Sequence, residues 1–411
     1  MGKTDLTPTA THEPERTGKF IVPGLAGGHA VFHWGLQSFL VLLPEIQAAF
    51  QLSGVGVGAI LTVREVVSGL VTLPGGVVVD MLRRHWGIFL TVCILGFSAG
   101  ALLMGLSPVY ALLIVGMALV AISHSIWHLL AGASLSHHFP DRRGITLSIH
   151  GVGGSIGDVA GPLVTGALLG LLSWRGILSI YAVVPFFLAF TLIFAFKKIG
   201  QSNDGTTDTV ELKERMTATR QLLKVPSLWG IALVKGLRGM SLVALLTTLP
   251  LYLGNELDLG YFTRGYHVGL LIAFGLIAKP AAGYLSDRIG RRKVLVPGLI
   301  WSCAMCLLLT VYTDGLAFTI LIALLGLFLY PDQPVLTAAA LDLVDRNVAS
   351  TMLGMTSFAA FGLSALSPLI AGALYESMGL TATLFYVAVL FALAAAIMLV
   401  LPLKRVGRAD A

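Results

Sequence analysis

Residues 263–293, TRGYHVGLLIAFGLIAKPAAGYLSDRIGRRK, join a long apolar run to a short, strongly charged loop. The apolar run is long enough to cross the ~30 Å hydrocarbon core of a bilayer, which takes about 20 helical residues. A backbone in lipid must satisfy its own hydrogen bonds, so this segment is expected to be a helix. The charged loop marks the point at which the chain returns to water.

The same kind of segment recurs along the whole chain of 411 residues, of which 56% are hydrophobic and only 12% are charged. A soluble domain averages about 25% charged residues, so much of this surface must face lipid. The apolar runs predict an all-α membrane protein of twelve transmembrane helices. We expect these helices near residues 22–46, 55–79, 87–107, 109–136, 145–170, 176–196, 227–251, 263–286, 294–313, 316–340, 349–374 and 380–402.

Basic residues predict the orientation. Among the expected loops on one side, only Arg175 and Arg264 are basic, whereas the other side holds most of the Lys and Arg. By the positive-inside rule, both termini are expected in the cytoplasm. This topology accounts for the pI near 9.3 without a nucleic-acid partner. The chain has no N-x-Ser/Thr sequon, which agrees with a bacterial cytoplasmic (inner) membrane.

The longest polar stretch separates six expected helices from six more, and it predicts a cytoplasmic linker between two bundles. The predicted parts are a tail (1–20), a six-helix bundle (21–196), the linker (197–226), a second six-helix bundle (227–403) and a tail (404–411).

The two bundles share landmarks at nearly one offset, which indicates an internal duplication. Pro162-Leu-Val-Thr-Gly166-Ala-Leu recurs as Pro368-Leu-Ile-Ala-Gly372-Ala-Leu. Asp80, four residues after Gly76, corresponds to Asp287 in the second half, and Asp141-Arg142 corresponds to Asp345-Arg346. Transporters are commonly built from such repeats, so we expect pseudo-symmetric halves with a site between them.

The segment Gly283-Tyr-Leu-Ser-Asp287-Arg288-Ile-Gly290-Arg291-Arg292-Lys293 closely resembles the signature loop of the major facilitator superfamily. The first copy differs, with Met81 and Arg83 where that loop usually has Arg and Gly. The resemblance covers the whole chain. It implies helices 1, 4, 7 and 10 at the centre, with 2, 5, 8 and 11 flanking them.

Two finer resemblances concern the first half. The helix-5 segment Gly157-x-x-x-Gly161-Pro162-x-x-Thr165-Gly166 is similar to the antiporter motif, with Thr165 in place of a glycine. The first half is also similar to the fosmidomycin-resistance branch of exporters, through residues 29–44, His128 and residues 151–168. The antiporter resemblance implies export rather than import.

Charged residues inside the expected helices mark candidate sites, because charge at the bilayer centre costs about 2.5–3.5 kcal/mol on insertion scales. These residues are Arg64, Glu65, Asp158, Lys235, Arg238, Lys279 and Asp332. Helices 3, 6, 9 and 12 have none, so we expect them outermost, against lipid; helix 11 also has none and is the exception to this pattern.

Arg64 and Arg238 are the predicted substrate-charge residues, together with Gln333 beside Asp332. Adjacent residues of a helix point about 100° apart, so we expect Arg64 and Glu65 to face different groups. A structural ion pair to a neighbouring helix is the alternative for both. Lys235 and Arg238 share a face, and with Lys279 they indicate a cavity that attracts anions. The alternative for Lys235 and Lys279 is snorkelling to the cytoplasmic water.

Asp158, Asp332, Glu65 and His128 are the predicted proton-handling residues. A carboxylate inside a membrane can gain and lose a proton near neutral pH. The alternative for Asp158 is a hydrogen bond that supports packing of its glycine-rich helix.

Five histidines lie in expected helices 1, 4 and 5: His29, His33, His124, His128 and His150. His29 with His33, and His124 with His128, are spaced i,i+4 and share a face. Imidazoles can relay protons or hold substrate, and we predict substrate contacts for His33 and His128. A metal site and plain hydrogen-bonded core histidines are the alternatives. Because no cysteine or carboxylate pattern accompanies the pairs, the sequence predicts no metal.

The two charged loops predict gates rather than substrate sites, because an acid at a helix end can hold one conformation through a neighbouring base. The gating residues are Gly76, Asp80, Arg84, Gly283, Asp287, Arg288, Gly290 and Arg291. In helix 5, Gly157, Gly161, Pro162 and Gly166 are expected to tighten packing.

The sequence therefore predicts a monomeric, proton-coupled exporter of a small anionic organic compound, without a cofactor. A proton-coupled uptake symporter of a carboxylate-like anion fits the same charges. A membrane receptor or assembly protein is the alternative of another class, although it has no need of titratable groups in a bundle core. We find no nucleophile–base pair and so predict no enzyme.

Overall fold

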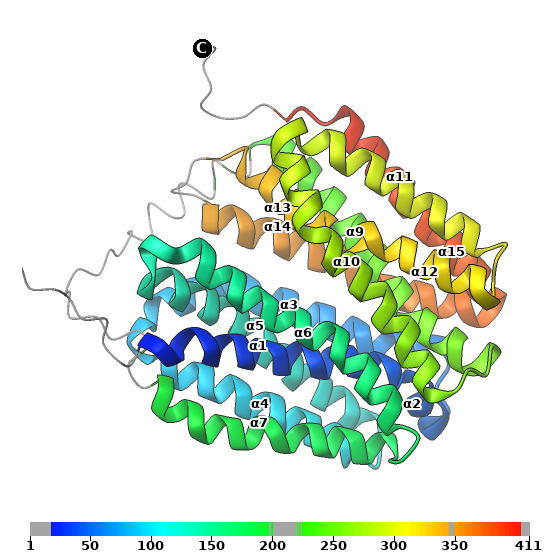
Figure 1. Cartoon of the computed structure of the whole chain (residues 1–411), viewed down its shortest axis with the longest axis horizontal. Helices are drawn as coiled ribbons and strands as arrows, with labels where there is room; N and C mark the ends of the chain where they lie inside the picture. The colour runs from blue at the N-terminus through cyan, green and yellow to red at the C-terminus, as the bar shows by residue number, and fades with distance from the viewer. Residues whose placement is uncertain are drawn as a thin grey trace, which may run out of the picture.

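In the computed structural model the chain is almost wholly helical (Figure 1). The structure describes residues 18–196, 224–344 and 349–403 together with positions 199, 220 and 222. Most of the predicted linker, residues 404–411, residues 1–17, and Asp345 with Arg346 lie outside the described residues.

The first half comprises seven α-helices and two short 3-10 turns. They are α1 (Gly18–Val41), α2 (Leu43–Phe50), α3 (Gly54–Met81), η1 (Arg83–His85), α4 (Trp86–Gly105), α5 (Tyr110–His138), η2 (Pro140–Arg142), α6 (Arg143–Leu168) and α7 (Trp174–Phe196). The second half comprises α9 (Pro226–Leu251), η3 (Tyr252–Glu256), α10 (Tyr261–Ile289), α11 (Arg291–Leu309), α12 (Gly315–Leu329), α13 (Asp332–Leu341), α14 (Ala349–Ser364) and α15 (Ser367–Val400).

The twelve predicted crossings are present, but three of them are broken helices. The first crossing is α1 with α2, the tenth is α12 with α13, and the eleventh is α14 with the start of α15. Pro44, Pro331 and Pro368 lie at these breaks, and proline lacks the N–H that would continue the hydrogen-bond ladder. Crossings eleven and twelve meet inside α15 at Gly379, whose φ of 73° is left-handed and favours glycine.

Nine stretches of the described chain are long and apolar enough to cross a membrane on those grounds alone, and one of them spans both crossings of α14 and α15. The helices α1 and α6 are equally long but outside this group. They carry His29, His33 and Asp158, which lower their mean hydropathy.

The helices form two bundles that meet along one interface (Figure 1). In the first half α1 packs along α6, and α4 packs against α5 and α7; in the second half α9 packs against α14 and α15. Between the halves, α3 contacts α14 and α15, and α6 contacts α10. The flanking positions that the family resemblance implies for helices 2, 5, 8 and 11 are therefore the interface.

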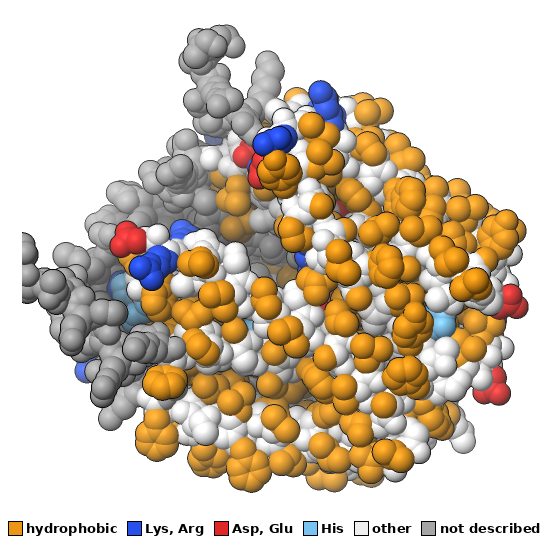
Figure 2. All heavy atoms as spheres, viewed as in Figure 1, with side chains coloured by type: hydrophobic (Ala, Val, Ile, Leu, Met, Phe, Trp, Pro, Cys, Tyr) orange, Lys and Arg blue, Asp and Glu red, His pale blue; other side chains and the backbone are white. Residues whose placement is uncertain are grey.

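The outer surface is largely hydrophobic, and most visible charged side chains lie toward the ends of the helices (Figure 2). The outward side chains include Ile88, Phe187, Phe194 and Val389, each at least half exposed. This surface and the helix lengths identify a multi-pass integral membrane protein.

Candidate functional site

Five imidazoles gather in the core of the first half, from α1, α5 and α6. The ring of His29 stacks on that of His150 with centroids 4.0 Å apart, and it meets His33 at 4.4 Å and His128 at 4.7 Å. His124 lies 4.4 Å from His128, with their Nε2 atoms 2.9 Å apart. The two predicted i,i+4 pairs thus form one cluster, which His150 joins. We call these five residues the histidine cluster.

Hydrogen bonds to oxygen atoms fix the orientation of three of these rings, one of them His150, whose Nδ1 lies 3.1 Å from the carbonyl oxygen of Leu25. His29 Nδ1 lies 2.7 Å from the carbonyl oxygen of His150, and His33 Nδ1 lies 2.8 Å from Asp158 Oδ1. The Nε2 atoms of His29 and His33 are buried and have no hydrogen-bond partner among the described residues. Ligand-capable nitrogens of His29, His33 and His128 lie within 4.8 Å of one another, so these three residues are the candidates for holding a metal ion.

Asp158 lies in the middle of α6, as expected, and faces α1. It accepts hydrogen bonds from His33 and from Gln37 Nε2, the latter at 3.1 Å. The sequence analysis missed Gln37, although it is spaced i,i+4 from His33 on the same face of α1. Asp158 thus ties α6 to α1, which fits the packing alternative; its proton-handling role stays a prediction.

The core of the second half holds an ion pair surrounded by further cations. Arg238 Nε donates to both carboxylate oxygens of Asp332, at 2.8 and 2.9 Å. One of the terminal guanidinium nitrogens, Nη2, donates to the carbonyl of Leu329. Both side chains are buried, Asp332 with 1% of its surface exposed. The bifurcated bond holds α9 against the break between α12 and α13.

Lys235 and Lys279 lie in the same core without a carboxylate partner at ion-pair distance among the described residues. The Nζ atom of buried Lys235 lies 3.4 Å from Thr356 Oγ1. Lys279, which is partly exposed, lies 5.8 Å from the centre of the Tyr330 ring. It is close enough to interact electrostatically with Asp332 in its own half and with Asp158 in the other. We call Lys235, Arg238, Lys279 and Asp332 the cation cluster.

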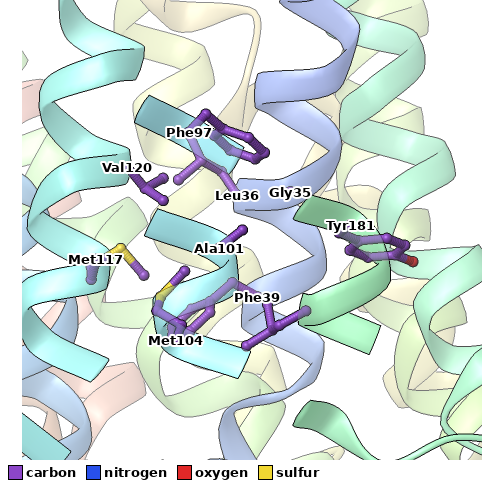
Figure 3. A pocket seen from close by; sticks show the side chains of 10 residues that line it. Gly35, Leu36, Phe39, Phe97, Ala101, Met104, Met117, Val120 and Tyr181 are labelled. Atoms are coloured by element: carbon purple, nitrogen blue, oxygen red, sulfur yellow. The ribbon is translucent and has the colours of Figure 1, made fainter. Parts of the chain in front are cut away.

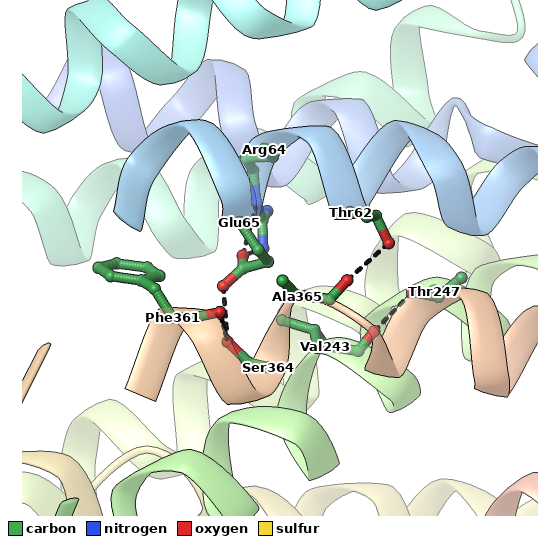
Figure 4. A network of polar contacts seen from close by, with 8 residues as sticks. All are labelled: Thr62, Arg64, Glu65, Val243, Thr247, Phe361, Ser364 and Ala365. Atoms are coloured by element: carbon green, nitrogen blue, oxygen red, sulfur yellow. Dashed lines mark hydrogen bonds and ion pairs between the residues drawn. The ribbon is translucent and has the colours of Figure 1, made fainter. Parts of the chain in front are cut away.

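Arg64 and Glu65 interact with each other, contrary to the expectation that they would face different groups. Arg64 bends along α3 so that its guanidinium lies 2.8 Å from Glu65 Oε1 (Figure 4). The other oxygen of Glu65 accepts a hydrogen bond from Ser364 of α14 at 3.1 Å. A long side chain can cancel the angular separation of neighbours, and Glu65 thereby links the two halves.

The two halves are joined most closely at the ends of the helices away from the basic loops. Arg264 donates to Glu45 at 2.7 Å, and Asn255 donates to Gln47 at 2.7 Å. The N–H of Gly54 donates to Glu376. In Figure 1 the two bundles converge here, beside α2 and the start of α10, and diverge toward the other end.

The repeated Pro-x-x-x-Gly segments build this junction symmetrically. A Cβ atom on Gly58 would lie 2.2 Å from the carbonyl of Pro368, and one on Gly265 would lie 2.3 Å from that of Pro162. Gly372 packs on Gly54 in the same way, and Gly166 packs on Tyr261. We call this junction the seal. By the positive-inside orientation it lies on the side of the membrane opposite the cytoplasm.

The other motif glycines of α6 pack it against α1. A Cβ atom on Gly157 would lie 2.2 Å from the carbonyl of Ala30, and one on Gly161 would lie 2.7 Å from that of Trp34. The buried Thr165, where the antiporter motif has a glycine, instead bonds the hydroxyl of Tyr181 at 2.9 Å. This segment packs closely on α1 and α10.

The gating residues of the second half form contacts of the kind predicted. Arg291 forms ion pairs with Asp287 and, at 3.1 Å, with Asp342. Gly290 has a φ of 98°, which favours glycine after the end of α10. Arg288 lies over the ring of Tyr284, and Gly283 lies in the last turns of α10. In the first half Arg84 is exposed, and the side chains at Gly76 and Asp80 lie outside the described residues.

Gln333 is exposed, beside buried Asp332, and its predicted substrate contact stays a prediction.

A small apolar pocket in the first half lies between α1, α4, α5 and α7, with Phe39, Phe97 and Met117 in its wall (Figure 3). The hydroxyl of Tyr181 points away from this pocket. With no charged side chain in its lining, it is a packing defect rather than a site for an anion.

Known proteins resemble this chain over most of its length. It is 24% identical to an uncharacterized MFS-type transporter, YfnC, of Bacillus subtilis, over 85% of each chain. It is 22% identical to a probable nitrate transporter, NarT, of Staphylococcus carnosus, over 68% of this chain and 69% of that one. It is 24% identical to the multidrug resistance protein MdtG of Escherichia coli, over 51% and 55%.

The fold is also found among solved structures. A bacterial homolog of the human lysosomal transporter Spinster, in an inward-facing and occupied conformation, superposes with a TM-score of 0.80 at 14% identity. The match covers 94% of this chain and 97% of that one. The resemblance to the fosmidomycin-resistance branch stays a prediction. The model of the Major Facilitator Superfamily matches residues 25–279 and 265–410, which together span both halves, and the chain therefore belongs to this superfamily of transporters.

Proposed function

We propose that this transporter carries a small organic anion together with a proton, by alternating access, and that the cation cluster is the centre of its site. The observation that supports this most directly is the excess of positive charge in a buried place. Arg238 and Lys279 lie near one carboxylate, Asp332, and Lys235 adds a third cation close to Arg238. An unpaired charge in a membrane interior is costly unless it serves a partner, and an anion supplies one.

The Arg238–Asp332 pair offers a way to couple the anion to a proton. Arg238 from α9 and Lys279 from α10 face Asp332, and the N–H of Gln333 and the ring of Tyr330 lie beside them. When Asp332 takes up a proton it loses its charge, and the guanidinium is left without its bidentate acceptor. An anionic group of the substrate then replaces the carboxylate on Arg238.

This arrangement favours symport. A proton on Asp332 makes the site more positive and so strengthens anion binding, which means that the two ligands bind together rather than in exchange. An inwardly directed proton gradient then drives uptake. The name of NarT, a probable nitrate transporter, concerns a small anion and agrees with this proposal.

Proton-coupled export is the second candidate, and the glycine-rich segment of α6 favours it through its resemblance to the antiporter motif. The name of MdtG, a multidrug resistance protein, agrees with export. The two candidates differ in the direction of proton flow that an added substrate causes.

The seal supports a resting state that is open toward the cytoplasm. The hydrogen bonds that join described residues of one half to described residues of the other lie between Glu65, near the middle of α3, and the seal. Transport then requires the seal to open and the basic ends to close. The ion pairs of Arg291 lie at the basic ends of the helices, which have to approach one another in this motion.

The test uses proteoliposomes that enclose a pH-sensitive dye. Nitrate, a carboxylate, a sulfonate and a phosphate ester are added outside in turn, with a sugar and a quaternary amine as neutral and cationic controls. Symport predicts acidification of the lumen by at least one anion. Alkalinisation of the lumen by an anion added outside means that anion entry drives protons out, and it supports proton exchange, and so export, instead. A response to the amine alone contradicts an anion site.

Two variants separate substrate binding from proton coupling. Arg238→Ala is expected to lose both acidification and anion counterflow. Asp332→Asn is expected to keep counterflow, which needs no net proton movement, and to lose acidification. Exposed Arg142→Ala and Asp314→Asn are matched controls that keep both. Undiminished acidification by Asp332→Asn would contradict its coupling role.

A further inference from the structure

The two buried Nε2 atoms of the histidine cluster have a defined chemical state. A carbonyl oxygen only accepts hydrogen bonds, so the Nδ1 atom of His29, 2.7 Å from the carbonyl of His150, carries the hydrogen. The same holds for the Nδ1 atom of His33, 2.8 Å from the carboxylate of Asp158. In the neutral ring the Nε2 atom then presents a lone pair. Only 7% of the surface of His29 is exposed, so this lone pair has no ready access to bulk water.

This pattern is the one that metal-binding histidines show. A histidine ligand almost always donates its other ring N–H to a carboxylate or a backbone carbonyl, which fixes the tautomer and the direction of the lone pair. Here His33 has the carboxylate and His29 has the carbonyl.

A third imidazole completes the set. A ligand nitrogen of His128 lies within 4.8 Å of those of His29 and His33. Metal–nitrogen bonds of about 2.0–2.1 Å in tetrahedral geometry put ligand nitrogens about 3.3–3.5 Å apart. Side-chain rotations that bring each nitrogen inward by about 1 Å or less satisfy this spacing. His33 and His128 are partly exposed, which leaves a route for an ion and a free fourth position.

We propose that His29, His33 and His128 form a binding site for a divalent transition-metal ion of the zinc class. Imidazole nitrogens suit Zn²⁺, Ni²⁺ and Co²⁺, whereas Mg²⁺ and Ca²⁺ require several oxygen ligands. Asp158 is a positioning residue that orients His33 and balances part of the charge of the ion. The site lies in the opposite half from the cation cluster, and the assignment does not depend on the proposed anion transport.

The sequence predicts no metal here because the spacing within each helix does not show which helices meet. Each i,i+4 pair offers two imidazoles, which is too few for a zinc site without further ligands. The third ligand, His128, comes from α5, and the acceptors that set the tautomers belong to α6. A hydrogen-bonded network of histidines without an ion is the competing interpretation, and it predicts no stoichiometric metal binding.

Metal binding is measured on the full chain, purified in detergent without a histidine tag and washed with a chelator. Calorimetric titration with Zn²⁺ is expected to give one ion per chain. Titration with Co²⁺ is expected to give the intense visible absorption of a four-coordinate ion. His29→Ala and His33→Ala each lose the Co²⁺ spectrum, and Asp158→Ala weakens binding by about 10- to 100-fold.

His267→Ala is the matched control. His267 is also buried in a transmembrane helix, but both of its ring nitrogens have partners, the carbonyl of Thr263 at 2.8 Å and Thr319 Oγ1 at 2.9 Å. It is expected to bind the ion as the wild type does. The double variant His137→Ala/His138→Ala controls for binding at the end of α5, which lies outside the cluster.

A variant that fails to fold is distinguished by a second measurement. Zn²⁺ is expected to raise the Tm of the wild type and of His267→Ala but not of folded His33→Gln, which keeps the polarity of the position. The proposal is overturned if folded wild-type protein binds no Zn²⁺. It is also overturned if His33→Gln and His267→Ala bind the ion equally well.

Discussion

The seal and the polar cores show how differently two regions of a duplicated protein can diverge. At the seal both halves use the same device, a proline carbonyl packed on a glycine of the other half, at Pro162 with Gly265 and at Pro368 with Gly58. In the cores each half has one buried aspartate, but the basic groups differ, since one core holds imidazoles and the other holds guanidinium and ammonium groups. Backbone packing constrains the seal, because a rocking motion needs two equivalent contacts, whereas the cores are free to bind different ligands.

The largest expected effect comes from breaking the buried pair of the cation cluster. Asp332→Ala leaves Arg238 buried without its carboxylate, and loss of one partner of a buried pair costs about 3–5 kcal/mol. We expect a large fall in Tm in detergent and no anion transport. Arg238→Ala is expected to lose transport as well.

The double variant Arg238→Met/Asp332→Leu separates stability from function. Apolar replacement of both partners is often neutral or stabilising, so the Tm is expected to recover. Transport is expected to remain absent, because the cation that binds the anion is gone. Recovery of transport together with the Tm would show that the pair is structural only.

The next effect tests the symmetry of the seal. Gly58→Leu and Gly265→Leu each place a side chain against a proline carbonyl of the opposite half. Overpacking of this kind costs about 1–3 kcal/mol, which shifts the balance between closed and open seals by about 5- to 150-fold. Equal shifts in the two variants are expected from the repeat.

The measurement is the labelling rate of a single cysteine at Thr62, with Cys93, Cys303 and Cys306 replaced by serine. An impermeant maleimide added to right-side-out vesicles is expected to react faster in both variants. Gly362→Leu is the matched control, because a Cβ atom there meets nothing within 4 Å. An effect confined to one variant would contradict a symmetric seal.

Most of the fold was predictable because hydrophobic length alone decides which segments cross a bilayer. The predicted crossings agree with the helices to within several residues. The breaks at Leu42, at Pro331 and between Ser364 and Ser367 were not predicted, because mean hydropathy carries no information on backbone angles. Pro44, Pro331 and Pro368 were the available signals.

The site was predictable in its residues but not in its contacts. The histidines, Asp158, Lys235, Arg238, Lys279 and Asp332 lie inside the two bundles, whereas Arg64 and Glu65 lie at the interface between the halves; their roles stay predictions. The spacing within a helix could not show that His150 stacks on His29, or that Arg64 bends back to Glu65. Those contacts depend on how helices distant in the chain are packed, and on the reach of long side chains.

A smaller effect is expected at the ion pair between Glu45 and Arg264, which we call the rim of the seal. There the two repeats no longer use the same contact. Glu45 and Arg264 form an ion pair in which Arg264 is buried, and the other repeat has the contact between Gly54 and Glu376 instead. Glu45→Gln keeps the shape and weakens the charge-assisted bond by about 1–2 kcal/mol. The Thr62 cysteine is expected to label roughly tenfold faster, less than in the more severe glycine variants.

The exchanged variant Glu45→Arg/Arg264→Glu is the check on this interpretation. If attraction between the charges holds the rim closed, the exchange is expected to restore slow labelling in part. Labelling as fast as in Glu45→Gln would mean that the geometry of the original pair, rather than its charge, closes the rim.

The smallest effect concerns Thr165, the position at which α6 departs from the antiporter motif. Thr165 bonds Tyr181 of α7, inside the first half, and contacts neither core. Thr165→Gly completes the motif but loses this hydrogen bond and adds a helix glycine, each at about 1 kcal/mol, so the Tm is expected to fall slightly. Tyr181→Phe removes the same bond and serves as the control.

In the proteoliposome assay the direction of proton flow is expected to be the same in wild type and both variants, because the charges that couple proton and anion lie in the other half. A reversal of flow in Thr165→Gly alone would show that the α6 motif, and not the cation cluster, determines the direction of transport.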